Sequence, residues 1–199
     1  GSFAPWKGAI WSEHCSQHLF DPYSFSHVLH GFLFFWLISL IAPRLTARWK
    51  LLITVLLEAG WELLENSAFI IHRYREATID QGYSGDSIFN SVSDMACCIL
   101  GFFIARKLGF RLSLLLFATI ELILLFWVRD NLTLNIIMLI HPVEAIKHWQ
   151  MSAGNPGLVV FPPAGHVTAL WLFCFIIPWP SRINNHTSNR KAPQPAGTI

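Results

Sequence analysis

The sequence predicts an all-α fold: a polytopic membrane helical bundle of about five transmembrane helices with one short interfacial or re-entrant helix. Three observations predict it. Of the 199 residues, 53% are hydrophobic and 13% are charged, against roughly 25% charged in an average soluble domain. Apolar runs recur along the chain, and several approach the length of about 20 residues that a span needs. Basic residues gather in alternate loops, as the positive-inside rule requires.

The predicted spans follow one another with short loops between them. They cover residues 25–42, 51–71, 88–105, 110–128 and 167–179. The apolar run 132–141 covers only about half a bilayer, which favours an interfacial or re-entrant helix. The expected organisation is therefore a periplasmic N-terminal segment at 1–24, a transmembrane domain at 25–182 and a disordered, Pro-rich cytoplasmic tail at 183–199.

The loop charges give the predicted spans a direction. Two loops carry basic residues and no acid, namely Arg44, Arg48 and Lys50 in the first and Arg106, Lys107 and Arg111 in the second. Loops 72–87 and 129–165 are mixed in charge. Because basic loops stay in the cytoplasm, the N-terminal segment and the mixed loops are expected on the opposite side.

Ionisable and amide side chains lie at one end of the first four predicted spans, the end away from the cytoplasm. They are Asp21, His27, His30, Glu58, Glu62, Glu65, Asp86, Asn90, Asp94, Glu121, Arg129 and Asp130. Charged groups inside a bilayer cost several kcal/mol each unless they pair or serve a site. The sequence therefore predicts one polar chamber, and the function is expected there.

The start of the first span places two histidines on one helix face. Asp21 and Pro22 suit a helix start, and steps of three residues bring Ser24, His27 and His30 together. Two histidines one turn apart can share a metal ion or relay a proton. The alternative is that each imidazole bonds a neighbouring carboxylate and only joins helices.

Three glutamates in the second span also share one face. Glu58, Glu62 and Glu65 are spaced i, i+4 and i+7. Ionised carboxylates stacked in a low dielectric repel one another, so either some are protonated or cations lie among them. The candidate metal ligands are His27, His30, Glu58 and Glu62. This mixed set of imidazoles and carboxylates suits Zn, Mn or Fe.

The loop after the second span carries candidate substrate ligands. Arg73 and Arg75 could bind a phosphate or carboxylate through two hydrogen bonds, although snorkelling to lipid headgroups is the alternative. Asp86 is expected to cap the third span, where Asp86, Asn90 and Asp94 share a face. The full predicted substrate-binding set is Arg73, Arg75, Tyr83, Asn66, Asn90 and Asp86.

Two further expectations concern the fourth span. Arg129 and Asp130, at its outer end, are expected to form no more than a surface ion pair. Glu121 is expected to face inward.

Five stretches carry a family resemblance, at 21–31, 58–67, 73–78, 85–94 and 129–135. Together they resemble an uncharacterised bacterial integral-membrane family, domain of unknown function 2585, also called uncharacterised protein family 0314. The resemblance implies a multi-pass protein of the bacterial inner membrane with the chamber facing the periplasm, and it brings no assigned activity. A distant, pattern-level likeness to VanZ-like membrane proteins implies a cell-envelope target. It rests on Asp21, His27 or His30, Glu62 or Glu65, Asn90, Asp94 and Gly101.

Three hypotheses for the chamber follow. The first is a hydrolase or transferase acting on a lipid-linked or envelope substrate, with His27, His30, Glu62, Glu65 and Asp94 as catalytic residues. The second is a lipid- or antibiotic-binding protein, or an accessory subunit of a membrane complex. The third is a small transporter or proton relay, disfavoured because the cytoplasmic halves of the spans are almost purely apolar. Membrane lipids are the expected partners, and the net charge of +2 without a basic stripe excludes nucleic acid.

Overall fold

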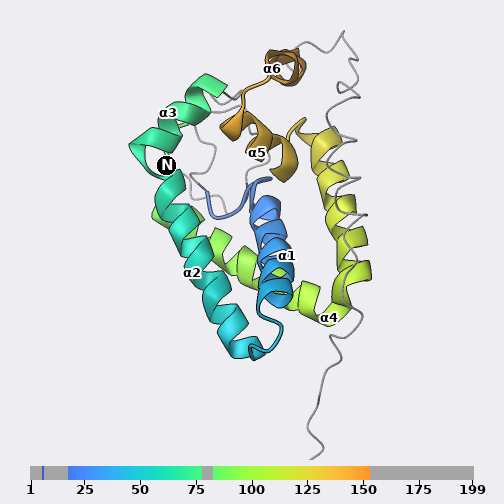
Figure 1. Cartoon of the computed structure of the whole chain (residues 1–199). Helices are drawn as coiled ribbons and strands as arrows, with labels where there is room; N and C mark the ends of the chain where they lie inside the picture. The colour runs from blue at the N-terminus through green and yellow to red at the C-terminus, as the bar shows by residue number, and fades with distance from the viewer. Residues whose placement is uncertain (1–5, 7–17, 78–82, 153–199) are drawn as a thin grey trace, which may run out of the picture. The chain divides into compact units, whose positions relative to one another are not determined.

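The computed structural model describes residues 6, 18–77 and 83–152, and within them the chain forms helices and no strand. In chain order the helices are α1 (Ser24–Ile41), α2 (Ala47–Glu65), α3 (Ala68–Ala77), α4 (Ile88–Trp127), α5 (Leu132–Ile140) and α6 (Glu144–Met151) (Figure 1). The predicted all-α class is confirmed for this part of the chain. The predicted span 167–179 and the tail 183–199 lie outside the described residues.

Helix α1 forms close to the predicted bounds. The Asp21 carboxylate accepts the backbone N–H groups of Tyr23 and Ser24 at 2.8 and 3.2 Å, so it caps the first turn as the sequence predicted. The helix ends at Ile41, two residues before Pro43, where proline disfavours further helix.

The prediction of one continuous span at 51–71 is wrong. Helix α2 ends at Glu65, and α3 starts at Ala68. The break comes from two side chains that bind the backbone: Asn66 Nδ2 donates to the Glu62 carbonyl at 3.0 Å, and Ser67 Oγ accepts the N–H of Ile70 at 3.4 Å. Such local bonds compete with the helical ladder. Helix α3 also occupies the start of the predicted 72–87 loop.

Helix α2 turns a polar face inward. Its buried residues are Lys50, Thr54, Glu58 and Glu62, one per turn. Its large apolar side chains lie on the outside, with Leu56 62% and Leu63 79% exposed. This arrangement is the reverse of a helix in a water-soluble protein and matches a helix whose surroundings are apolar.

The predicted spans 88–105 and 110–128 form the two arms of α4. Gly109 separates the arms with φ 72° and ψ 175°, a conformation that residues with a Cβ rarely adopt. The arms diverge at this point in Figure 1, and each is roughly 20 residues long, the length of a span. Within the described residues, α1 and α4 are the helices long and apolar enough to cross a membrane. Five spans are not shown.

Two glycines bring α1 and α4 together. A Cβ on Gly31 would overlap the Cys98 carbonyl oxygen of α4, and a Cβ on Gly101 would overlap the Val28 carbonyl oxygen of α1. The helices therefore meet backbone to backbone, as small residues allow in membrane bundles. This contact packs Val28 and Gly31 of α1 against residues 98–102 in the first arm of α4.

The chain after α4 folds around a buried carboxylate. Glu121 accepts the N–H groups of Leu132 and Thr133 at 3.0 and 3.1 Å, so it faces inward as expected and caps α5. Helix α5 falls within the predicted 132–141 segment. Helix α6, which buries Ile146 and Trp149, was not predicted.

Candidate functional site

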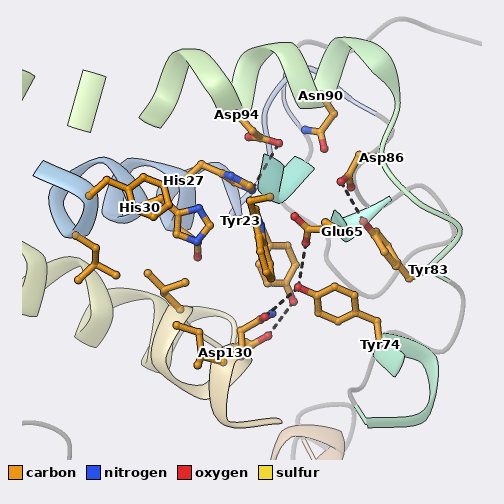
Figure 2. Close-up of a pocket in the computed structure, with 17 residues that line it drawn as sticks. Tyr23, His27, His30, Glu65, Tyr74, Tyr83, Asp86, Asn90, Asp94 and Asp130 are labelled. Carbon is orange, nitrogen blue, oxygen red and sulfur yellow. Dashed lines mark hydrogen bonds and ion pairs between the residues drawn. The ribbon is translucent and has the colours of Figure 1, made fainter. Parts of the chain in front are cut away.

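The polar ends of the helices surround one cavity of about 230 Å³. Its walls come from α1, the end of α2, α3, the segment before α4 with the start of α4, and the residues before and within α5 (Figure 2). Such a space holds many waters or a small organic group. Of the residues that the sequence placed at one end of each span, seven line this cavity, namely His27, His30, Glu65, Asp86, Asn90, Asp94 and Asp130. Asp21, Glu58, Glu62, Glu121 and Arg129 are not among the lining residues.

Three tyrosines each donate a hydrogen bond to a carboxylate at the cavity wall (Figure 2). The pairs are Tyr23 with Asp130 at 3.1 Å, Tyr74 with Glu65 at 2.9 Å and Tyr83 with Asp86 at 3.0 Å. Burial raises the pKa of Tyr74 and of Tyr83, so both phenols stay protonated and act as donors. Each pair fixes one carboxylate and leaves oxygen lone pairs for a ligand.

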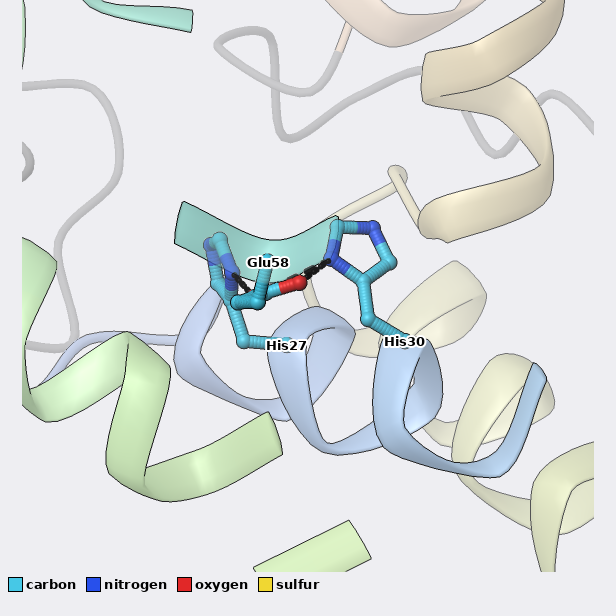
Figure 3. A group of neighbouring side chains, drawn as sticks. All are labelled: His27, His30 and Glu58. Atoms are coloured by element: carbon cyan, nitrogen blue, oxygen red, sulfur yellow. Dashed lines mark hydrogen bonds and ion pairs between the residues drawn. The ribbon is translucent and has the colours of Figure 1, made fainter. Parts of the chain in front are cut away.

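Glu58 joins the two histidines of α1 (Figure 3). Its carboxylate lies 2.7 Å from His27 Nδ1 and 3.0 Å from His30 Nδ1, and the residue is 1% exposed. When each Nδ1 carries the proton and donates to Glu58, each Nε2 keeps a free lone pair. This arrangement holds α1 against α2, as predicted by the alternative in which each imidazole bonds a carboxylate and joins helices. It also orients both rings.

A second group of side chains joins α1, α2 and α4. His27 Nε2 lies 3.8 Å from Asp94 Oδ2, and His27 Nδ1 lies 3.4 Å from Glu62 Oε1. Two sets of three potential metal ligands share His27: one adds His30 and Glu58, the other adds Glu62 and Asp94. Within each set the ligand atoms lie within 4.8 Å of one another, and all are buried.

The second set has unused oxygen atoms. Both carboxylate oxygens of Glu62 and Oδ1 of Asp94 are buried without a hydrogen bond from the described residues. Buried polar atoms almost always have a partner, and an unpaired buried carboxylate is costly. The second set is therefore the stronger candidate for holding a cation, while Glu58 orients His27 from behind.

Comparison with known proteins identifies the family. The model of a family described as a protein of unknown function, DUF2585, matches residues 1–152. The chain belongs to this family. A UPF0314 protein of Brucella anthropi is 48% identical over 150 residues, 75% of this chain and 76% of the relative. UPF0314 proteins of Sphingopyxis alaskensis and Rhizobium johnstonii are 46% and 50% identical, over 75% and 73% of this chain and 80% and 74% of their own lengths. No solved structure matches.

These matches confirm the DUF2585 resemblance seen in the sequence, whereas the likeness to VanZ-like proteins stays a prediction. The family description and the names of the relatives assign no reaction. The function of this DUF2585 protein has therefore to be argued from the site.

The two predicted anion-binding arginines do not line the cavity. Arg73 donates to the carbonyl oxygens of Leu139 and Ile140 at 2.9 and 3.3 Å, at the end of α5. Arg75 donates to the Tyr83 carbonyl at 2.6 Å. Both guanidinium groups therefore serve backbone carbonyls, and a role in substrate binding stays a prediction without support from their placement.

The three other predicted substrate ligands, Asn66, Asn90 and Asp86, lie in different surroundings. Asn90 lines the cavity, and its Nδ2 has no hydrogen-bond acceptor among the described residues. Asn66 bonds Asp86 and the α2 backbone instead. The prediction that Asp86 caps the third span is wrong, because Ser87 is the N-cap of α4 and accepts the Asn90 N–H at 3.2 Å. Asp86 lines the cavity.

Sequence reasoning missed part of the wall. Asp130 is 3% exposed and lines the cavity, so its assignment to a surface pair is wrong. Burial raises its pKa to about 7. Tyr23, Tyr74 and Trp61 also line the cavity and were not singled out. The one available signal for Asp130 was its position at the same end of a span as the other acids.

Proposed function

We propose that this protein is a multi-pass inner-membrane hydrolase or transferase acting on a lipid-linked or envelope substrate. Its reaction centre is a divalent ion held by His27, Glu62 and Asp94, on the periplasmic side. The observation that carries the proposal is the set of buried, unpaired carboxylate oxygens of Glu62 and Asp94 beside His27. Glu62 Oε1 lies 3.4 Å from His27 Nδ1, but a structural role alone would leave Glu62 Oε2 and Asp94 Oδ1 without a hydrogen bond.

The membrane location is supported by the distribution of apolar side chains. Helices α1 and α4 are apolar enough to cross a bilayer, and both arms of α4 expose large apolar residues, among them Phe103 and Phe126. The basic loop residues Arg106 and Lys107 precede the bend at Gly109, whereas the cavity lies at the other ends of both arms. This polarity agrees with a cytoplasmic bend and a periplasmic cavity.

The site supplies the parts that hydrolysis or group transfer needs. His27, Glu62 and Asp94 would hold a divalent ion such as Zn, Mn or Fe, and such an ion would supply a nucleophile by lowering the pKa of a bound water from 15.7 to about 7. The attacking oxygen would form a bond to the acyl carbon of the substrate while the bond to the leaving oxygen breaks. His30, which lines the cavity, would accept the water proton and return it to the leaving oxygen. Leu33, Phe34 and Trp61 line an apolar part of the cavity, which suits the apolar portion of a lipid-linked substrate.

Metal analysis tests this proposal. Wild-type protein purified from membranes without chelator is expected to hold about one equivalent of a transition metal. His27→Asn, Glu62→Gln and Asp94→Asn are each expected to retain less than about a tenth of it, because each removes one ligand.

His72→Asn and Glu144→Gln are matched controls, since both side chains are more than 70% exposed and lie outside the cavity wall. They are expected to keep the wild-type metal content. Size-exclusion profiles identify variants that do not fold. Wild-type protein without metal after growth in supplemented medium, or folded ligand variants with full metal, would overturn the proposal and favour a binding protein.

A proton relay is the second candidate, favoured by the buried face of α2. The expectation that the cytoplasmic halves are almost purely apolar needs correction, because Lys50 and Thr54 are buried there and Lys50 Nζ donates to Ser39 Oγ at 3.0 Å. With Glu58 and Glu62 they form a polar line along the helix.

A proton-flux assay tests the relay. Proteoliposomes containing the wild type are expected to acidify faster than protein-free liposomes, because the polar line along α2 would conduct protons. Thr54→Val is expected to slow the flux, since it removes a buried hydroxyl. Thr119→Val is the matched control, because the Thr119 hydroxyl is on the surface and bonds only within its own helix. Equal rates with and without protein would remove this candidate.

A further inference from the structure

The cavity walls point to a substrate class for the proposed enzyme: we infer that the group bound there is an organic ammonium ion. The inference rests on the proposed function for the reaction, but the recognition of the ligand depends only on the walls. Three properties of the walls carry it: the sign of their charge, their unused acceptor atoms and their aromatic faces.

Most of the ionisable side chains at the cavity wall are acidic, beside the two histidines His27 and His30. Four carboxylates line it, from Glu65, Asp86, Asp94 and Asp130, and no lysine or arginine is among the described lining residues. Arg73, Arg75 and Arg129 bond other groups: the Leu139 carbonyl, the Tyr83 carbonyl and the Trp149 carbonyl, respectively. A phosphate or carboxylate group would meet like charges in this space, whereas a cation would relieve their mutual repulsion.

The walls also present acceptors that have no donor. Asp94 is 3% exposed, and its Oδ1 accepts no hydrogen bond from the described residues. Glu65 Oε2 is also buried and also accepts none from them. Tyr74 holds the other oxygen of Glu65, so the free oxygen has a fixed position. Figure 2 shows both carboxylates at the cavity wall. A ligand with N–H donors or a positive charge would satisfy these atoms.

Aromatic rings favour an organic cation over a bare metal ion in the body of the cavity. Trp61, Phe34 and the tyrosines Tyr23, Tyr74 and Tyr83 line it. Aromatic faces attract ammonium groups within about 6 Å of the ring centre, and carboxylates with aromatic walls are the usual surroundings of bound ammonium. The volume of about 230 Å³ also exceeds what one ion needs.

Three small probes of matched shape test the inference. Choline is the cationic probe, 3,3-dimethylbutan-1-ol is its neutral carbon analogue and 3,3-dimethylbutanoate is an anionic analogue. Binding to detergent-solubilised protein is measured by saturation-transfer NMR titration. Choline is expected to bind at least about tenfold more tightly than the alcohol, and the anion most weakly.

Glu65→Gln keeps an acceptor for Tyr74 and removes one negative charge from the wall. It is expected to lower the affinity for choline about tenfold and to leave the affinity for the alcohol unchanged. Glu144→Gln, exposed and outside the wall, is expected to change neither. Equal affinities for choline and the alcohol, tighter binding of the anion, or an unchanged choline affinity in Glu65→Gln would overturn the inference.

The same experiment separates this inference from the proposed reaction centre. Glu65 belongs to neither set of metal ligands, so Glu65→Gln is expected to keep its metal while losing choline affinity. Charge-selective choline binding in a protein without metal would refute the metal centre alone. A full metal complement without charge selectivity would refute the ammonium site alone.

The pH dependence of choline binding gives a second measurement. Burial, together with the charge of Glu121, raises the pKa of Asp130 to about 7, against the hydrogen bonds from the Asn131 backbone, Tyr23 and Gln150, which lower it. A cation binds the ionised carboxylate, so affinity is expected to rise as pH rises from about 6 to about 8. Asp130→Asn, which keeps the shape, is expected to remove the part of this rise that belongs to Asp130. An identical rise in that variant would contradict the assignment.

Discussion

Gly31→Leu and Gly101→Leu are expected to abolish assembly of the bundle, and Gly31→Ala to destabilise it strongly. A Cβ on Gly31 would overlap the Cys98 carbonyl oxygen and lie 2.6 Å from the Phe102 nitrogen. Both atoms are backbone, so relief requires the two helices to separate along their contact. Overpacking of this kind costs about 1–3 kcal/mol and more where nothing can move.

The measurement is the apparent melting temperature of the protein in detergent. Gly31→Ala is expected to lower the melting temperature by roughly 6–12 °C. This range takes an overpacking cost of about 3 kcal/mol, with each kcal/mol corresponding to about 2–4 °C in a chain of this size. Gly60→Ala in α2 is the matched control, because nothing lies within 4 Å of its added Cβ and alanine favours the helix. A wild-type melting temperature for Gly31→Ala would show that α1 and α4 do not meet as described.

The helical stripes of polar residues were predictable, because spacing alone determines which side chains share a face. The sequence therefore identified His27, Glu62 and Asp94 as neighbours in the chamber. Asp21 was found as a cap for the same reason, since its role depends on adjacent residues. Helix bounds were accurate where a proline lies close to the end, as at Ile41 and Pro43.

The errors have two sources: local bonds from side chains to the backbone, and partners that lie far away in the sequence. The break at Asn66 looked like part of a continuous apolar run, because the run carries no proline. Arg73 looked like an anion ligand because the sequence does not show that the end of α5 would lie beside it. Asp130 looked exposed because its partners Tyr23 and Gln150 are supplied by distant segments.

Glu58→Gln separates the two possible sets of metal ligands. If the ion is held by His27, Glu62 and Asp94, then Glu58 only orients the His27 ring. Loss of such an orienting carboxylate typically lowers metal affinity about 10–100-fold without abolishing binding. The expected result is therefore a weaker site that still fills at saturating Zn, measured by competition with a chromogenic chelator. Glu76→Gln, an exposed carboxylate, serves as the control.

His30→Asn completes this test, because His30 belongs to the first set of ligands and not to the second. It is expected to leave the affinity for Zn nearly unchanged, since asparagine can still donate to Glu58 and hold its carboxylate toward His27. Abolished binding in both His30→Asn and Glu58→Gln would instead assign the ion to His27, His30 and Glu58. Asp94, which lines the cavity, would then be free for the substrate, and the negative charge available to an ammonium group would increase. The position of the metal and the strength of ammonium binding are therefore linked. In His30→Asn and Glu58→Gln, competition for Zn measures the first and choline titration measures the second.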